Sequence, residues 1–450
     1  MKSGLPQALK WLISALMVMG CYVLGATPRT EFLPTFLLFS GLFLGMIAFF
    51  WASKKFFSWK KIFLLGLGMR LVVSFTLPNW SEDYARFLWD GKLLELGENP
   101  YAESPNSTMG NSKFASSAYL NTLLESMNSP EYYSVYPPLN QSLFWLASAS
   151  SGDSIILGVT ALRLILLFGE IGVFFLLFRL LRTWGLSQTK MIWYWLNPLV
   201  VLEIVGNVHF EGLVLMFLLA SVLSFFKGMF GFSGGLWGLA AGLKLLPLIL
   251  GPAFVFASKT KAQKTFWIGF FLMVGICFWP LLIGDSFSRF FESLQLYQGK
   301  FEFNASVYYV LREIGFWIQG YNIIGDLTKG LSVLTIGLII FFSWKKSPKN
   351  DLELVDLFVL IYLIYLILQP VVHPWYILPG LGLSILAERK TFILWSFGAV
   401  FSYQAYGNPE NWENPLLLTL EYGLVLVGIW MDYFTPKRNP IFEAGGLRNG

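Results

Sequence analysis

Apolar residues fill most of the chain in runs that are separated by short polar segments. The runs are about 13 to 27 residues long, and a helix needs about 20 apolar residues to cross a membrane. This pattern predicts an all-α fold, a polytopic bundle of about 13 to 14 transmembrane helices. A further apolar run, residues 137–150, is too short to cross at about 1.5 Å per residue and is expected to dip in instead. The expected spans are residues 9–25, 31–52, 61–77, 155–181, 190–206, 210–227, 231–243, 246–257, 265–284, 328–344, 354–371, 374–388, 391–407 and 415–433.

The composition supports a single transmembrane domain over residues 1–450, because 55% of residues are hydrophobic and only 13% are charged. Soluble domains carry about 25% charged residues, although the length alone would allow about three of them. The net charge of +5 is spread over many short loops, so no nucleic-acid partner is expected. Cys21 and Cys277 lie in apolar runs, which argues against a disulfide framework or a zinc site. The first run lacks a small-residue cleavage signal and is expected to be an anchor.

Basic residues in short loops predict which side of the membrane each loop faces. Two long loops, residues 78–136 and 285–327, are acidic instead; the first has three basic residues against eight acids. We therefore expect the basic loops and both termini in the cytoplasm and the two acidic loops outside. This orientation requires residues 231–257 to form two short helices that turn outside near Lys244. The basic segments are Lys54 to Lys61, Arg179 to Lys190, Lys259 to Lys264, Lys345 to Lys349, Arg389–Lys390 and Lys437–Arg438.

Under this topology, the polar residues that interrupt apolar sequence gather on the outer side. A charge inside a membrane costs about 2.5 to 3.5 kcal/mol on insertion scales, so it usually has a partner or a function. The chain has only two histidines, and both fall on this side. One shared outward-facing site would explain the pattern. Its members are Asp83, Arg86 and Asp90 of the first outer loop, Asn207, His209 and Glu211 of a second turn, Lys244, and His373, Trp375 and Tyr376 of a further turn.

Each of these residues also has a purely structural interpretation. His209 and His373 could cap helices, and Lys244 could extend from a helix end to the membrane interface. Trp375 and Tyr376 could belong to the aromatic belt of a membrane protein. Charged residues inside the apolar runs are expected to be buried structural groups: Arg163 and Glu170 in ion pairs with neighbours, and Arg70 and Glu203 as polar members of the bundle.

A helix is predicted at the start of the first outer loop. Ser81 can act as its N-cap, with Glu82 and Asp83 in the first turn, and Gly97 with the following Asn-Pro-Tyr ends it. A carboxylate held there could act as a general base on a hydroxyl that arrives from outside, although acids in a first turn also stabilise a helix by themselves. An apolar stripe predicts that the helix lies on the membrane surface; it consists of Tyr84, Phe87, Leu88 and Leu94, flanked by Trp89.

Four short segments lie on the predicted outer side of the membrane, and their order along the chain is informative. They are Glu82-Asp83 to Tyr101, Tyr136-Pro-Pro-Leu, Asn197-Pro198 with Asn207-Val-His209-Phe-Glu211-Gly, and Gly242-Leu-Lys244-Leu-Leu-Pro247. Together they resemble the polyprenyl-phosphate-sugar-dependent glycosyltransferases of the GT-C superfamily. The chain is most similar to the bacterial polyprenol-phosphate-mannose-dependent mannosyltransferases, and the match covers roughly residues 60–385. The first two and the last two spans are not diagnostic.

The resemblance implies an acidic catalytic base in the first outer loop, where Asp83 is the matching position and the neighbouring Glu82 is the alternative base. It also implies a contribution from the second outer turn, here His209, Glu211 and Asn207, although family members often carry Asn-Asp where this chain has Phe210-Glu211. The residues expected to hold the donor phosphate are Lys244, Arg86 and His373. Those expected to contact the sugar or the acceptor are Trp89, Asp90, Tyr136, Trp375 and Tyr376.

The reaction that the resemblance implies is inverting transfer of a sugar, mannose at the family level, from polyprenyl phosphate to an acceptor hydroxyl. The acceptor could be a glycolipid, a lipid-linked glycan or a protein, and membrane lipids surround the enzyme. The sequence has no Gly-rich phosphate loop for a nucleotide sugar. Some GT-C enzymes need Mg²⁺ or Mn²⁺ and others do not, and one or two carboxylates are a thin basis for a metal site. The expected location is the bacterial inner membrane, with the site on the periplasmic or outer face.

Two other functions are compatible with the spans. A transporter or lipid flippase would use intramembrane charges as its pathway. Against it, the sequence has no matching pair of broken helices in two halves, and the polar residues cluster outside rather than at the midplane. A membrane acyltransferase that uses His209 or His373 would leave the helix at Glu82 and Asp83 without a role.

Overall fold

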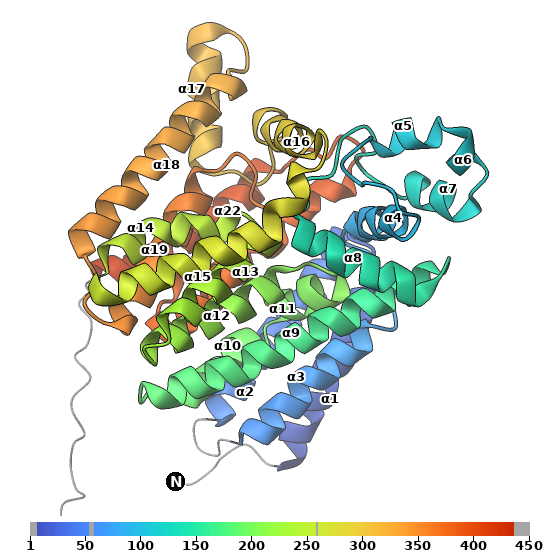
Figure 1. Cartoon of the computed structure of the whole chain (residues 1–450). Coiled ribbons are helices and arrows are strands. Elements are labelled where there is room, and N and C mark those ends of the chain that lie inside the picture. The colour runs from blue at the N-terminus through green and yellow to red at the C-terminus, as the bar shows by residue number, and fades with distance from the viewer. Residues whose placement is uncertain (1–6, 54–57, 258–259, 436–450) are drawn as a thin grey trace, which may run out of the picture.

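The structure is a computed structural model that describes residues 7–53, 58–257 and 260–435. These residues form an all-α bundle with no β-strand among them; a single parallel bridge joins Phe303 to Val371 (Figure 1). The basic residues Lys54–Lys55, Lys259 and Lys437–Arg438, which were assigned to the cytoplasm, lie outside the described residues. The described chain therefore has the predicted fold class, a polytopic helical bundle.

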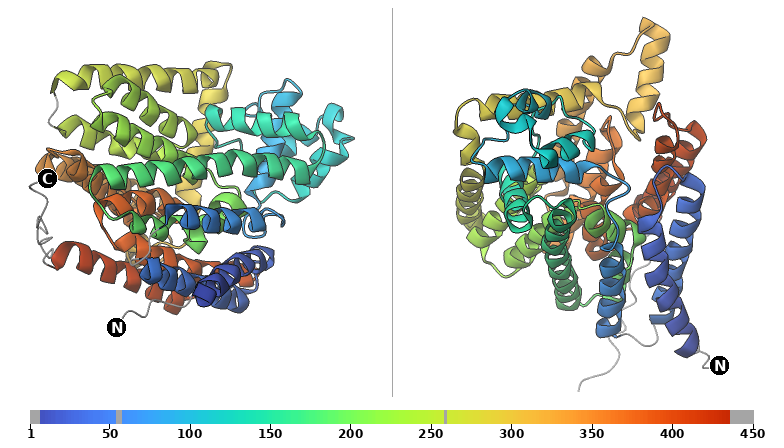
Figure 2. Two further views of the ribbon diagram at one scale, coloured as in Figure 1. Left: turned by 90° about the horizontal axis from the view of Figure 1, so that it is seen from below. Right: turned by 90° about the vertical axis from the view of Figure 1, so that its right-hand side faces the viewer.

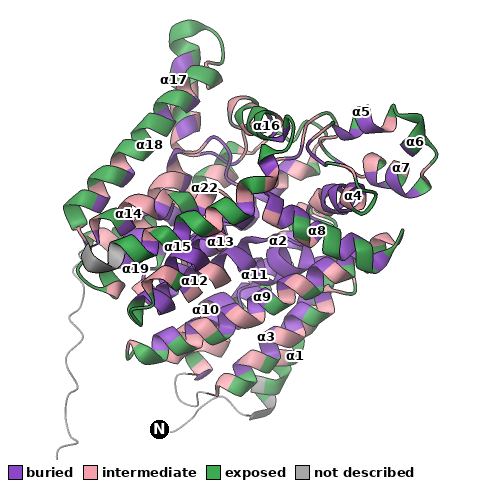
Figure 3. Cartoon of the chain, viewed as in Figure 1, coloured by how far each residue is buried: buried purple, intermediate pink, exposed green. Residues whose placement is uncertain are grey.

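Within the described ranges, five helices are long and apolar enough to cross a membrane. A sixth span is possible if a bent pair counts as one, residues Pro198–Gly206 and Glu211–Phe226, which meet at 109°. Apolar residues on the outward faces of the long helices are exposed, as lipid-facing residues would be; Figure 3 shows them along α15 and α18. The five are α2 (Phe32–Ser53), α9 (Ile155–Thr183), α15 (Thr260–Phe278) continued by η4 (Trp279–Leu282), α18 (Ile324–Lys346), and α22 (Pro415–Ile429) continued by η7 (Trp430–Phe434).

The remaining predicted spans also contain helices, but these are shorter or interrupted. Asn197-Pro198 breaks the predicted span 190–206, because proline has no N–H to donate and clashes with the preceding turn. The turn near Lys244 separates two short helices, as expected. The shorter elements are α1 (Gln7–Ala26), α3 (Trp59–Val73), η1 (Gln188–Met191), α10 (Ile192–Trp195), α11 (Pro198–Val200), η2 (Val201–Gly206), α12 (Glu211–Phe226), α13 (Phe230–Leu243), η3 (Leu246–Leu250), α14 (Gly251–Phe256), α19 (Asp351–Leu368), η5 (Pro374–Ile377), α20 (Leu378–Ala387), α21 (Thr391–Gly398) and η6 (Ala399–Gly407).

The two long acidic loops lie at the same end of the bundle, opposite the beginning of α1 (Figure 2, right). Helix α8, at 14 residues, is too short to cross a membrane, as predicted. It runs beside α4 at that end of the bundle (Figure 1). The loop helices are α4 (Asp83–Glu95), α5 (Pro105–Met109), α6 (Ser112–Ala115), α7 (Ala118–Glu125) and α8 (Pro138–Ser151), and then α16 (Ser286–Lys300) and α17 (Val307–Gln319).

Helix α4 is buried in protein, so the prediction that its apolar stripe lies on the membrane surface is wrong. Phe87, Leu88 and Trp89 are at most 2% exposed, and the helix packs between α7 and α8. An apolar stripe has the same sequence pattern whether it faces lipid or protein, which is the physical reason for the error. The predicted end is confirmed: Gly97 has φ +78°, and its N–H donates to the carbonyl of Leu94.

Buried charges tie the central helices together. Arg70 of α3 and Glu170 of α9 form a fully buried ion pair with Nη2–Oε2 at 2.6 Å, and the hydroxyl of Tyr194 donates to the same carboxylate at 2.7 Å. Arg163 donates instead to backbone carbonyls, including those of Val205 at 2.9 Å and Gly206 at 2.6 Å. The predicted structural ion pair is therefore confirmed for Glu170, whereas Arg163 binds the end of η2.

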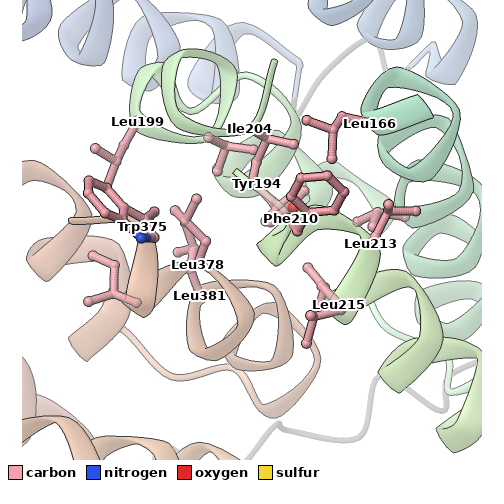
Figure 4. Packing of buried hydrophobic residues seen from close by; sticks show 14 of the residues in the cluster. Leu166, Tyr194, Leu199, Ile204, Phe210, Leu213, Leu215, Trp375, Leu378 and Leu381 are labelled. Carbon is pink, nitrogen blue, oxygen red and sulfur yellow. The ribbon is translucent and has the colours of Figure 1, made fainter. Parts of the chain in front are cut away.

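The break between η2 and α12 lies within the main hydrophobic core. Ile204 and Phe210, on either side of the break, lie near Trp375 and the following helix α20 (Figure 4). Close contact with α20 is possible because residue 382 is glycine: a Cβ there would lie 2.2 Å from the Leu215 side chain. This packing fixes the polar turn between η2 and α12.

Candidate functional site

A cavity of about 630 Å³ lies between α4 and α16. Segments from both halves of the chain line it: the first turn of α4, residues 127–137, the start of α12, residues 243–246, part of α16, and residues 301–303 and 369–379. Most of the predicted site residues line this cavity, namely Glu82, Asp83, Arg86, Tyr136, His209, Glu211, Lys244, His373, Trp375 and Tyr376. The geometry thus brings together residues that are up to 294 positions apart (82 to 376).

Asp83 and His209 are in contact at the wall of the cavity. Their Oδ2 and Nε2 atoms are 3.6 Å apart, and the other ring nitrogen of His209, Nδ1, lies 2.9 Å from Oε2 of Glu203. Burial lowers the pKa of His209, but the two carboxylates more than offset this effect and raise it to about 9. Burial alone would raise the pKa of Asp83, yet the contact with His209 brings it below the usual value. Asp83 is therefore ionised at neutral pH.

A strained turn positions His209. Its backbone N–H donates to the carbonyl of Glu203 at 3.1 Å, and Val208 takes φ +59°, which is unusual for a β-branched residue. The preceding element η2 is a π-helix, a geometry often found at functional sites. Arg163 binds the carbonyls of Val205 and Gly206, so it holds the end of η2 where a helix terminus is negatively polarised.

Asn207 lies outside the residues that line the cavity. Its side-chain oxygen accepts from the backbone N–H of Trp80 at 3.2 Å, and its Nδ2 donates to Glu203 at 3.3 Å. Asn207 therefore connects the strained turn to the segment that leads into α4.

An aromatic stack forms one wall of the cavity. Trp375 lies between His209, at 3.8 Å between ring centroids, and His373, at 4.4 Å. Phe303 packs on the other side of His373 at 5.0 Å. The prediction that Trp375 presents a ring face to a sugar is wrong, because imidazoles cover both of its faces. Burial lowers the pKa of His373 to about 3, although the Asp83 carboxylate opposes this effect. His373 is therefore a neutral hydrogen-bonding group rather than a cation.

Glu82 and Asp83 have different partners. Glu82 pairs with Arg29, whose guanidinium also lies 4.0 Å from the ring centroid of Tyr406. The N-cap of α4 is Glu82 and not Ser81 as predicted, so the helix begins one residue later; the hydroxyl of Ser81 still accepts from the backbone N–H of Asp83 at 3.2 Å. Of the two adjacent acids, Asp83 is the one in contact with a histidine.

Two cations line the cavity near Asp83. Lys244, just after α13, pairs with Glu211 and lies 5.5 Å from the ring centroid of Tyr376. Arg86 donates through Nε to Asp90 at 2.8 Å and through Nη1 to the carbonyl of Tyr132 at 3.0 Å. Its buried Nη2 has no hydrogen-bond partner in the described part of the chain. Arg86 as a residue lines the cavity.

Two predicted contacts with sugar or acceptor are wrong. Trp89 is 1% exposed and Asp90 is fully buried, and both lie outside the residues that line the cavity. Asp90 accepts from Ser134 at 2.5 Å and from Gln141 at 2.8 Å in addition to Arg86, so its function is to hold Arg86. Asp90 shares a helix face with Asp83 and Arg86 but lies two turns further along α4 than Asp83, where Ser134 and Gln141 bind its carboxylate.

The residues do not fit a metal site. Across the ranges that the structure describes, no group of three or more His, Cys, Asp or Glu could hold an ion. Both ring nitrogens of His209 already face carboxylates.

Three residues that sequence reasoning did not select belong to the site or its support. Arg29 and Phe303 line the cavity, and Glu203 contacts His209. Arg29 had a signal, because it is a basic residue in a short loop that the predicted topology places outside. Glu203 was assigned to the buried bundle, and nothing in the sequence shows that its neighbour there is His209. Phe303 is one of 43 phenylalanines and had no signal.

Comparisons with known proteins identify relatives. A family model described as alpha-(1->6)-mannopyranosyltransferase, N-terminal domain, matches residues 7–260. The chain is also similar to alpha-(1->6)-mannopyranosyltransferase B of Corynebacterium glutamicum. The two are 25% identical over 420 residues, which cover 82% of this chain and 67% of the relative.

Proposed function

The chain belongs to the alpha-(1->6)-mannopyranosyltransferase family and is a membrane mannosyltransferase of the GT-C type, and from this premise we propose its donor, its face and its catalytic residues. The proposed donor is polyprenyl-phosphate mannose, and the proposed acceptor is a hydroxyl of a glycolipid, a lipid-linked glycan or a protein. The reaction inverts the anomeric carbon. If the product is α-linked, as in the name of the relative, an inverting reaction requires a β-linked donor.

The proposed base is Asp83, and its contact with His209 is the observation that carries the proposal. The acceptor oxygen attacks the anomeric carbon of mannose while its proton passes to the Asp83 carboxylate. The bond from that carbon to the phosphate oxygen breaks, and polyprenyl phosphate leaves. A base must be unprotonated to act, and the low pKa of Asp83 keeps it so at neutral pH.

Arg86 and Lys244 are proposed to stabilise the leaving phosphate. Negative charge grows on the phosphate as the bond breaks, and fixed donors in a water-poor cavity stabilise such charge strongly. Arg86 and Lys244 line the same cavity, and Nη2 of Arg86 has no hydrogen-bond partner in the described part of the chain. His373 would add a neutral hydrogen bond. Tyr136 and Tyr376 are the aromatic residues proposed to contact the sugar.

The site is proposed to face the periplasmic or outer side of a bacterial inner membrane. The acidic loop residues 78–136 and 285–327 both contribute to the cavity, whereas basic loops favour the cytoplasm. A lipid-linked donor is suited to that side, because its sugar can reach the cavity while its tail stays in the bilayer.

The test uses purified protein in liposomes with radiolabelled polyprenyl-phosphate mannose and extracted membrane glycolipids. Asp83→Asn should lower transfer by about 10²- to 10⁴-fold, the usual contribution of a general base, while the protein stays folded. Glu82→Gln is the matched control at the neighbouring acid and should retain most activity. If Asp83→Asn is as active as the wild type, another residue must be the base. Transbilayer lipid movement without any sugar transfer would favour a flippase instead.

A further inference from the structure

We propose that Glu203 is a positioning residue, which acts through His209 to hold the Asp83 carboxylate in place; this inference rests on the proposed function. Glu203 is fully buried and lies outside the residues that line the cavity, so it does not touch a substrate. Its Oε2 is 2.9 Å from Nδ1 of His209, and Nε2 of the same ring is 3.6 Å from Oδ2 of Asp83. One imidazole therefore bridges a buried acid and the acid on the cavity wall.

Glu203 is itself fixed from two sides. The hydroxyl of Tyr403, from η6 near the end of the chain, donates to Oε1, and Nδ2 of Asn207 reaches the same oxygen at 3.3 Å. The ring of Tyr403 packs on Trp80, with 4.6 Å between the ring centroids. Because Trp80 leads into α4, the same group of side chains that orients Glu203 also contacts the segment that carries Asp83.

The local backbone brings Glu203 and His209 together. Both belong to the irregular turn in which the π-helix η2 ends and Val208 is left-handed. The backbone N–H of His209 donates to the carbonyl of Glu203, so the two residues are joined through backbone and side chain alike. A regular α-helix through residues 203–209 would place these two side chains about 120° apart around the helix axis, on different faces.

A charge argument supports the same role. A buried carboxylate is costly unless it is paired, and the pairing of Glu203 favours the protonated, positively charged form of His209. That charge in turn favours ionised Asp83. The side chain of Trp375 covers one face of the imidazole. Asp83 and Glu203 are the charged groups that act on His209. His373 and Lys244 also act on Asp83, and Lys244 and Arg29 also act on His373.

The decisive variant is Glu203→Gln, which keeps the shape of the side chain and removes its charge. The kcat for mannosyl transfer at pH 7 should fall on the order of 10- to 100-fold, as expected when one close contact between charged groups is lost. The KM for the donor should stay the same, because Glu203 does not contact it. The alkaline limb of the kcat–pH profile should move to lower pH, because His209 without the Glu203 charge loses its proton at lower pH and a neutral His209 no longer attracts the Asp83 carboxylate. Tyr403→Phe should shift the profile in the same direction by less.

Glu170→Gln is the matched control. Glu170 is also a fully buried acid that accepts from a tyrosine hydroxyl and pairs with a cation, but its partners are Tyr194 and Arg70. This variant should lower thermal stability and leave the kcat–pH profile of the folded fraction unchanged. If the loss of any buried acid were enough to change the pH dependence, the kcat–pH profiles of Glu170→Gln and Glu203→Gln would shift alike.

The outcomes separate this inference from the proposed function. If Asp83→Asn is inactive and Glu203→Gln keeps the wild-type kcat and pH profile, the positioning role is refuted and the base stands. If Asp83→Asn is fully active, the proposed base is refuted, and the positioning role that rests on it is refuted as well. If Glu203→Gln fails to fold, Tyr403→Phe provides the test, and an unchanged pH profile in that variant overturns the role of Glu203.

Discussion

Replacing Gly91 with alanine should displace helix α4 from α8 and thereby move Asp83. Gly91 faces the backbone of α8, where a new Cβ would lie 2.3 Å from the carbonyl oxygen of Phe144 and 3.1 Å from Cβ of Ser148. Ordinary van der Waals contact begins at 3.4 Å. The closest atom is backbone in the middle of a helix and cannot rotate away, so the two helices must separate.

The size of the displacement follows from these distances. Moving from 2.3 Å to 3.4 Å requires a shift of about 1 Å, and misplacing catalytic groups by about 1 Å can cost on the order of 100-fold in rate. Overpacking of a core typically costs about 1 to 3 kcal/mol of stability. We expect Gly91→Ala to lower kcat by about 10- to 100-fold and to lower the free energy of unfolding within that range.

The assay is mannosyl transfer in liposomes together with thermal unfolding in detergent. Gly337→Ala in α18 is the control, because nothing lies within 4 Å of its new Cβ; it should leave kcat unchanged and should not lower thermal stability, since alanine favours a helix more than glycine does. Wild-type kcat in a stably folded Gly91→Ala protein would refute the view that α4 is held rigidly against α8 to place Asp83.

Two further changes test the leaving-group site and the core. Lys244→Gln should reduce kcat on the order of 10²- to 10³-fold at saturating donor, the usual cost of removing one charge-stabilising donor; transfer assays check this, and an unchanged kcat would exclude Lys244 from phosphate stabilisation. Arg70→Met leaves Glu170 buried without its cation and should cost about 3 to 5 kcal/mol of stability. Thermal unfolding checks this, and the double variant Arg70→Met/Glu170→Leu should recover most of the loss because it removes both charges. A double variant no more stable than Arg70→Met would contradict that account of the pair.

The hydrophobic pattern predicts the fold class well, because a lipid environment requires helices in which backbone groups pair internally. It cannot predict where a helix bends or how an apolar stripe is covered. The break at Pro198 has a sequence signal, whereas the π-helix that follows has none. Helix α4 illustrates the second limit. An apolar stripe has the same sequence pattern whether lipid or protein covers it, and in this fold α8 packs against α4.

The candidate site is predictable to the extent that its residues interrupt apolar sequence. Asp83, His209 and Lys244 stand out for this reason, and the structure places them on one cavity. Glu203 interrupts apolar sequence too, yet its contact with His209 depends on an irregular turn that composition does not reveal. Trp375 was selected for the wrong contact, because stacking by two histidines is a property of the assembled fold.

The cavity wall is assembled from residues as far apart as Arg29 and Asn411, which has a consequence for biosynthesis. A membrane protein enters the bilayer as it is translated, so Asp83 is inserted long before Trp375 has been made. Until the ribosome has passed residue 411, the nascent chain lacks part of the cavity wall. We therefore expect a chain that stops before this residue to be inactive, because its cavity is incomplete.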